Sequence, residues 1–145
     1  MAPKHDPFEE GVSNDAQIEL NWAMKAAKYA ETYDRLRKSV KDLTTFRMTK
    51  IDDLIYSSFR FTFPELNIDA VEEEELKSED AKKKWRPFLM PFEGKIPDWN
   101  MATLLRVDCK KDCDEHNTII VPRCQYLAIE IARNKEGVNA KQYAK

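Results

Sequence analysis

The sequence predicts one α+β domain that follows a short tail. Apolar residues recur at helical spacing through the first half of the chain, and short apolar runs of strand type follow them. We expect two long N-terminal helices and a charged helical segment to pack with a small, mainly antiparallel sheet, which a C-terminal helix covers. A chain of 145 residues fits one domain, which we place at 14–145, after a flexible tail over 1–13.

The most regular helical pattern begins at Asn14, a residue type that favours the N-cap position. Alanines raise the helix propensity of the residues that follow. The apolar stripe of this first helix consists of Ile18, Trp22, Tyr29, Tyr33, Leu36 and Val40. We interpret the stripe as a face that packs into the core rather than as a cofactor site.

A second helix is expected between Thr49, which can cap it, and Pro64, which ends it. Its apolar face consists of Ile51, Ile55 and Phe59, with Leu54 and Phe61 alongside.

Residues 69–86 carry an acidic run and then a basic run, and we expect helical turns with Ser78 as a cap in the middle. Pairs of opposite charge four residues apart would each stabilise these turns by roughly 0.2–0.5 kcal/mol. The pairs are Glu79 with Lys83 and Asp80 with Lys84. Pro87 is expected to end the segment directly after Trp85 and Arg86.

Three short apolar runs then predict strands, at residues 88–92, 101–108 and 118–121. Prolines flank and interrupt the first run, which confines it to the edge of the sheet. Gly94 lies in a turn, and the residues between the second and third runs are rich in Asp and Asn. The second and third strands should therefore form a hairpin with a long tip.

The last element is predicted to be a helix over residues 123–136, with Pro122 in its first turn. The alternation of apolar residues over 127–132 leaves a strand as the rival prediction. Gly137 follows the segment where a left-handed C-terminal cap would stand, and this favours the helix.

Composition argues against several classes of protein. The chain has three glycines and no glycine-rich loop that could cradle a phosphate or a nucleotide cofactor. A net charge of −2 gives no bulk attraction to nucleic acid or to anionic membranes, and no apolar run approaches the roughly 20 residues that span a bilayer. We expect no cofactor, no membrane and no direct nucleic-acid partner. Three cysteines in a chain without a secretory leader suggest reduced thiols and a cytoplasmic location, with a nuclear one as a further option.

Two sets of residues are candidates for chemistry. Cys109, Cys113, His116 and Cys124 form a metal-like cluster, but the cluster has no CxxC pair, so we expect no metal there and leave zinc as the alternative. The same residues could supply a cysteine nucleophile only in a geometry that the sequence does not fix, and we predict no catalytic residue. Residues 82–86 mix basic and aromatic side chains as nucleic-acid sites do, but the nearby acidic run argues against that use.

Charged side chains also stand inside otherwise apolar elements. Arg106 and Asp108 are two apart on one strand face, and Glu130 precedes Arg133 by three residues in the last helix. We favour a buried or half-buried ion-pair network that ties the helix to the sheet, with a partner-binding surface where the network reaches solvent as the alternative. The residues assigned to partner binding are Trp85, Arg86, Arg106, Asp108, Arg123, Glu130, Arg133 and Asn134.

Residues 77–88, 102–109 and 117–137 resemble the signature blocks of a small eukaryotic family named for a polysaccharide-biosynthesis domain, which has a yeast member. Residues 20–33 and 43–59 resemble its helical first half. The resemblance implies a cytosolic, ribosome-linked chaperone that helps newly synthesised translation elongation factor 1-alpha to fold by binding its GTP-binding domain. We therefore expect a non-enzymatic, client-specific chaperone.

The family name implies an alternative, which is a methyltransferase-like or carbohydrate-binding protein of polysaccharide biosynthesis. A methyltransferase needs a glycine-rich loop to hold the methyl donor, and the sequence has none. Cys113 and His116 are not part of the family pattern, which further weakens the zinc alternative.

Overall fold

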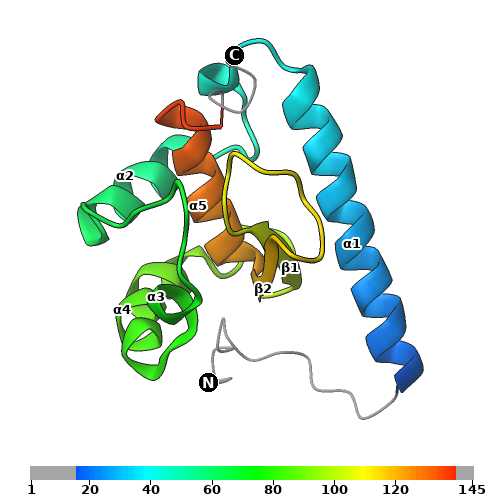
Figure 1. Ribbon diagram of the computed structural model, residues 1–145. Coiled ribbons are helices and arrows are strands. Elements are labelled where there is room, and N and C mark those ends of the chain that lie inside the picture. The colour runs from blue at the N-terminus through cyan, green and yellow to red at the C-terminus, as the bar shows by residue number, and fades with distance from the viewer. Residues whose placement is uncertain (1–15, 140–145) are drawn as a thin grey trace.

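Helix α5 (Arg123–Lys135) is the central element of the fold in a computed structural model, which describes residues 16–139. All of its residues from 124 to 134 are buried, and the other elements surround it (Figure 1). The other elements, in chain order, are α1 (Ala16–Ser39), η1 (Leu43–Thr45), α2 (Asp52–Thr62), α3 (Glu73–Lys77), α4 (Glu79–Leu89), η2 (Met90–Phe92), β1 (Ala102–Arg106) and β2 (Thr118–Pro122). The predicted α+β class is confirmed.

The two strands form the predicted antiparallel hairpin with a long tip. Ala102 pairs with Pro122 at one end of the ladder, and Arg106 pairs with Thr118 at the other. The connecting loop extends toward α1, which packs across β1 (Figure 1). An ion pair of 3.0 Å between Lys38 Nζ and Asp112 Oδ1 joins the loop to α1. The hairpin therefore packs against both α1 and α5.

Helix α1 agrees with the predicted helix over the residues that the structure describes. Ala26, Ala30 and Tyr33 point into the core. Leu36, predicted on the same stripe, is instead 49% exposed, and the next residue, Arg37, is buried. Three predicted positions have side chains outside the described part of the chain: Asn14, Ile18 and Trp22.

Helix α2 begins at Asp52, three residues later than predicted. The Asp52 carboxylate accepts hydrogen bonds of 2.7 Å from the backbone N–H groups of Met48 and Thr49, and this fixes a turn before the helix. Ile55 and Phe59 are buried as predicted. Phe61, predicted beside them, is 89% exposed, because two residues of helix turn it by about 200° away from Phe59.

The charged segment forms α3 and α4, with Ser78 between them. The Ser78 hydroxyl accepts a 3.1 Å hydrogen bond from the N–H of Ala81, which confirms the predicted cap. Pro87, however, lies inside α4 and does not end it. Trp85, Phe88 and Leu89 are all buried, and their i, i+3 and i+4 spacing carries one helical face past the proline.

The strand predicted over residues 88–92 is wrong. Its first two residues belong to α4, and the next three form the 3₁₀ helix η2. The Phe88 and Phe92 rings pack edge to face with centroids 5.6 Å apart, which the helical backbone allows on one side of the chain. The sheet of the described residues is consequently smaller than expected, with two strands instead of three.

The helix predicted over residues 123–136 is confirmed as α5, against the rival strand. Gly137 has a φ of +79°, the left-handed conformation that its predicted capping role requires. The Val138 N–H bonds the Arg133 carbonyl oxygen at 3.0 Å, and the Gly137 N–H bonds the Asn134 carbonyl oxygen at 3.3 Å. These two bonds define a Schellman motif, which turns the chain sharply at the helix end.

Gly94 also has a positive φ, +83°, in the predicted turn. Within the described part of the chain, every helix is too short or too polar to span a lipid bilayer. The tail predicted over residues 1–13 lies outside the residues that the structure describes.

Candidate functional site

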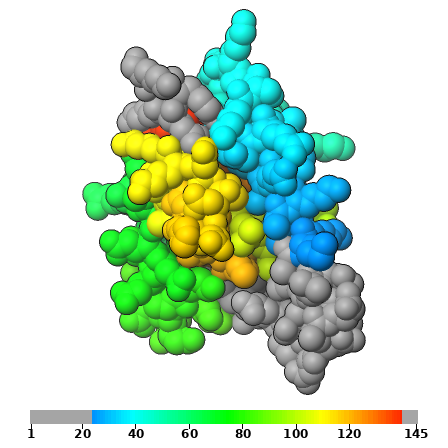
Figure 2. Space-filling view, turned by 45° about the vertical axis from the view of Figure 1, so that its right-hand side comes forward, coloured from blue at the N-terminus to red at the C-terminus, as the bar shows by residue number. Residues whose placement is uncertain are grey.

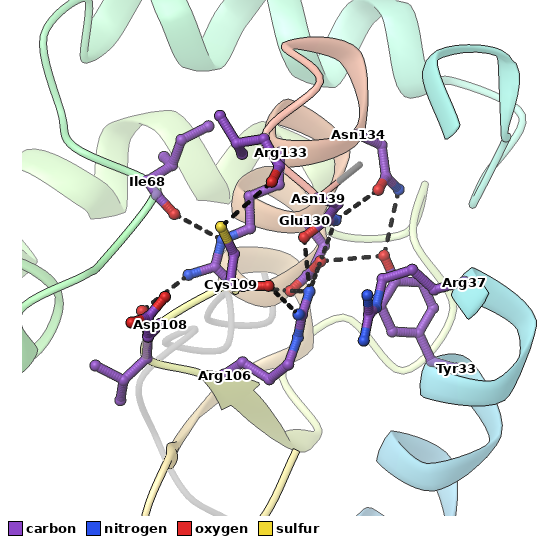
Figure 3. A network of polar contacts seen from close by, with 12 residues as sticks. Tyr33, Arg37, Ile68, Arg106, Asp108, Cys109, Glu130, Arg133, Asn134 and Asn139 are labelled. Carbon is purple, nitrogen blue, oxygen red and sulfur yellow. Dashed lines mark hydrogen bonds and ion pairs between the residues drawn. The ribbon is translucent and has the colours of Figure 1, made fainter. Parts of the chain in front are cut away.

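A carboxylate in the middle of α5, that of Glu130, lies at the centre of a polar network (Figure 3). Its side chain is 1% exposed. Tyr33 Oη, Asn139 Nδ2 and Arg106 Nη2 donate to Glu130 Oε1 at 3.0, 3.1 and 3.2 Å, and Arg133 Nη1 donates to Oε2 at 2.8 Å. We call these five residues and Asn134 the buried network. The network links α1, β1 and the residue after the Schellman turn to α5.

The two guanidinium groups of the buried network also bind backbone. Arg106 Nη1 donates to the carbonyl oxygen of Cys109 at 2.6 Å, where the chain leaves β1. Arg133 donates to two further carbonyl oxygens, those of Ile68 at 2.7 Å and Val107 at 3.1 Å. Buried charges are tolerated when they are paired and hydrogen-bonded, and both arginines meet that condition.

Glu130 is ionised at neutral pH although it is enclosed. Burial by itself would raise the pKa of its carboxyl, but the positive charges of Arg106 and Arg133 outweigh burial and lower this pKa to about 2. Burial, and then the charge of Glu130, hold the pKa of Tyr33 well above its ordinary value. The carboxylate therefore accepts and the phenol donates throughout the neutral range. A carboxyl with so low a pKa is a poor general base.

The structure brings four of the eight predicted partner-binding residues together in the buried network. Asn134 Nδ2 donates to Tyr33 Oη at 3.2 Å, and Asn139 Nδ2 donates to Asn134 Oδ1 at 2.6 Å. The four are Arg106, Glu130, Arg133 and Asn134, and all of them are buried. The ion-pair network favoured from the sequence is thus present, while a role of these residues in partner binding stays a prediction.

The other four predicted residues lie outside the buried network. Trp85 is buried in the core, where its indole N–H donates to the Glu75 carbonyl oxygen at 3.0 Å. The Arg123 guanidinium lies over the Tyr29 ring, 4.7 Å from its centroid. Arg86, Asp108 and Arg123 are half-buried. These three side chains are the predicted residues with atoms available to a partner in the folded chain, and their role also stays a prediction.

Two residues of the buried network were missed from the sequence. Tyr33 was assigned to the apolar stripe of the first helix, and its ring does lie in the core. Its hydroxyl, however, reaches Glu130 across 97 positions of sequence. Asn139 follows the Schellman turn in a stretch without periodicity, so no local pattern indicated it.

The cysteines and His116 are spread through the fold. The Cys109 thiol donates to the Val138 carbonyl oxygen at 3.7 Å, and burial raises the pKa of Cys124, in α5, to about 12. His116 is exposed beside Glu115, 3.3 Å away. Among residues 16–139, no three His, Cys, Asp or Glu side chains are grouped so that they could hold a metal ion.

An open groove of about 630 Å³ lies between α1 and the hairpin. Figure 2 shows the two elements side by side on one face of the molecule, with α1 in blue and the hairpin loop in yellow. The apolar part of the lining comes from Ala27, Ala30, Leu104 and Ile120. The four charged lining residues are all acidic: Glu31, Asp34, Asp114 and Glu115. We call this feature the acidic groove.

A small cavity of about 10 Å³ adjoins the acidic groove. The groove and the cavity have four lining residues in common: Ala30, Asp34, Leu104 and Cys113. Tyr33, Arg106, Tyr126 and Glu130 complete the lining of the cavity. The buried network therefore approaches the surface at the acidic groove.

A second groove, of about 460 Å³, lies between α2 and the end of α4 with η2. Its lining is mostly apolar and includes the exposed ring of Phe61, the proline Pro87 and the ring of Phe92. The thiol that lines the acidic groove is Cys113, and burial raises its pKa, which disfavours the nucleophilic thiolate.

A family model described as PBDC1 protein matches residues 18–144, which include the buried network and both grooves. The chain belongs to the PBDC1 family. It is 52% identical over 134 residues to Protein PBDC1 of Homo sapiens, covering 92% of this chain. It spans 57% of the length of that human protein.

Two comparisons with yeast proteins cover nearly the whole length of this chain and of the yeast protein. The Saccharomyces cerevisiae PBDC1 homolog is 44% identical over 134 residues, which cover 90% of this chain and 91% of the homolog. A solution NMR structure of the S. cerevisiae protein yst0336 has a TM-score of 0.79 and 39% identity, covering 97% of this chain and 99% of that one. The family indicated by the sequence resemblance is confirmed.

Proposed function

We propose that the chain is a non-enzymatic, client-specific chaperone that helps newly synthesised translation elongation factor 1-alpha to fold by binding its GTP-binding domain. One observation carries the choice of binding over catalysis. The charged residues at the centre of the fold hold one another, and Glu130 has four hydrogen-bonding side chains around its carboxylate. Two open grooves lie on the surface, of which the acidic groove adjoins the buried network.

The identity of the client comes from the family. The resemblance of the sequence to this family implied the elongation factor as client and the ribosome as the place of action. Membership of the PBDC1 family supports that expectation. The proposal accordingly includes a cytoplasmic location, with a nuclear one as an option, and no cofactor.

A chaperone for a partly folded client needs exposed apolar surface, and the structure has some. Phe61 is 89% exposed and Met24 is 61% exposed. Such side chains, when they gather on a surface, mark sites of protein contact. Phe61 also lines the groove beside η2, so this exposed ring lies in a concave part of the surface.

The alternative, a methyltransferase-like or carbohydrate-binding protein, is not favoured by any contact in the described residues. Gly94 and Gly137 both serve turns with positive φ, which leaves neither for a loop around a methyl donor. Calorimetry with S-adenosylmethionine should give no saturable heat. A stoichiometric binding isotherm would overturn the non-enzymatic proposal.

The chaperone proposal is tested by acute depletion of the protein in translating cells. A pulse of labelled amino acid marks new elongation factor 1-alpha, and its soluble fraction should fall while the pre-existing pool stays soluble. A newly made GTPase of another family is the matched control and should not respond. An unchanged soluble fraction of new elongation factor, with no enrichment on the tagged chaperone, would sink the proposal.

A further inference from the structure

The lining of the acidic groove combines apolar side chains with carboxylates, of which Asp34 is already paired with Arg37 and Lys38 of α1. Its four charged lining residues are carboxylates, whereas Leu104 and Ile120 supply apolar contact from the hairpin. Ile120 is 45% exposed although it is a large aliphatic residue of a strand. A lysine or arginine side chain has the matching form, with an aliphatic stem and a charged head.

A second observation points to a ligand at the same place. The hydroxyl of Tyr126 is buried and has no hydrogen-bond partner among the described residues. Tyr126 lines the small cavity that shares Ala30, Asp34, Leu104 and Cys113 with the acidic groove. A buried hydroxyl without a partner is destabilising, so a polar group supplied from the groove side would relieve this cost.

Other occupants fit these observations less well. Phosphate-bearing ligands would meet four carboxylates and no basic lining residue in the acidic groove. A metal ion would need several ligand side chains around it, and residues 16–139 contain no group of three His, Cys, Asp or Glu side chains that could hold one. A polypeptide segment remains, because it can bring both cationic heads and apolar side chains.

We infer that the acidic groove receives a basic, partly apolar segment of the client polypeptide. One lysine or arginine of that segment lies with its stem against Leu104 and Ile120 and its head toward Glu31 and Glu115. Tyr126 lines the cavity, which has room for about one water molecule, and such a water would bridge the head to the Tyr126 hydroxyl. The inference rests on the proposed function only for the identity of the client.

The first experiment measures binding of a fluorescein-labelled amphipathic peptide of lysine and leucine to the full chain by anisotropy. A matched peptide with glutamate in place of lysine is the control. The double variant Glu31→Lys with Glu115→Lys should weaken binding of the lysine peptide about tenfold. Neither side chain is buried: each pairs with a neighbour of its own segment and is more than half exposed.

A charge-matched control separates the groove from general attraction. Glu65→Lys with Glu74→Lys makes the same change in net charge at two exposed positions outside the groove, and should alter affinity less than about twofold. Equal weakening by the two double variants would overturn the inference. Tyr126→Phe keeps the ring and removes the hydroxyl, and should weaken binding about fivefold. If a folded Tyr126→Phe protein bound the peptide with unchanged affinity, the Tyr126 hydroxyl would have no part in binding.

The second experiment captures new elongation factor 1-alpha from a translating extract with the same variants. Loss of capture by the groove variant, with capture kept by the charge-matched control, is the expected result. If the wild type captures no elongation factor while the lysine peptide binds as described, the proposed function fails and the basic-segment inference stands. If the groove variant captures as well as the wild type, the proposed function stands and the client does not use this groove.

Discussion

The buried network around Glu130 and the aromatic cluster between α2 and α4 both join segments that are distant in the sequence, but they do so through different kinds of contact. In the network, charged groups meet through directed hydrogen bonds, and each partner has one position. In the cluster, rings pack at centroid distances of 4.4–6.2 Å and interplanar angles from 29° to 89°. The cluster consists of Phe59, Phe63, Trp85, Phe88 and Phe92.

The difference concerns how strictly each region fixes its neighbours. Aromatic rings gain from contact area over a range of angles, so the cluster can adjust to a change of side chain. A buried carboxylate between two guanidinium groups cannot adjust, because removing one member leaves charge without a partner. The polar region should therefore be the more sensitive of the two, although four of the five rings of the cluster are buried as well.

The largest expected effect comes from Glu130→Gln. The variant leaves Arg106 and Arg133 buried without a countercharge and should lower the free energy of unfolding by about 3–5 kcal/mol. Urea denaturation at pH 7 measures the loss. Glu136→Gln is the matched control in the same segment, because Glu136 pairs with Arg60 where both side chains are partly exposed. That change should cost about 1 kcal/mol or less, and equal losses would contradict the comparison.

A pH titration sharpens the same contrast. The pKa of Glu130 is about 2 in the folded protein and near 4.5 when unperturbed, so ionised Glu130 stabilises the fold fully above pH 4.5. This contribution, roughly 3 kcal/mol, is lost as the pH falls from 4.5 to about 2. The stability gap between the wild type and Glu130→Gln should narrow over that range. A gap that stays constant between pH 6 and pH 3 would show that folding does not lower the pKa of Glu130.

A smaller effect is expected in the aromatic cluster. Phe88→Leu keeps a large apolar side chain among rings that pack at varied angles, and it should cost less than about 1.5 kcal/mol. Thermal unfolding followed by circular dichroism measures the loss. A loss of stability as large as that of Glu130→Gln would mean that the cluster tolerates a change of side chain no better than the network does.

The smallest effect on stability is expected at Phe61, which is 89% exposed in the groove beside η2. Phe61→Ser removes surface that contributes little to the folded state and should change stability by no more than about 0.5 kcal/mol. Urea denaturation under the same conditions provides the check. A loss above 1 kcal/mol would show that the ring packs against the fold rather than standing free for a partner.

Local sequence patterns predicted the elements that local forces determine. Ser78 and Gly137 were recognised because a hydroxyl cap and a left-handed glycine act within one turn of their own helices. The hairpin followed in the same way from its turn-forming loop. An ion-pair network between the last helix and the sheet was also predicted, since charges inside apolar elements need partners, and Arg106 with Glu130 is the pair that forms it.

The failures arose where tertiary contacts override local rules. Pro87 was expected to end a helix, but burial of Phe88 and Leu89 on the same face as Trp85 favours its continuation. Phe61 and Leu36 were grouped with core residues although the completed fold leaves both exposed. Which apolar residues stay outside depends on elements that lie far away in the sequence.

The hydrogen bond between Tyr33 and Glu130 has a consequence for synthesis. It joins residues 97 positions apart, and the bond from Asn134 to the same hydroxyl spans 101. Helix α1 is synthesised before α5 and meets its buried partners only after α5 has emerged. Until then α1 and the hairpin lack the helix against which they pack, so the core of the described residues is completed only after α5 has been synthesised.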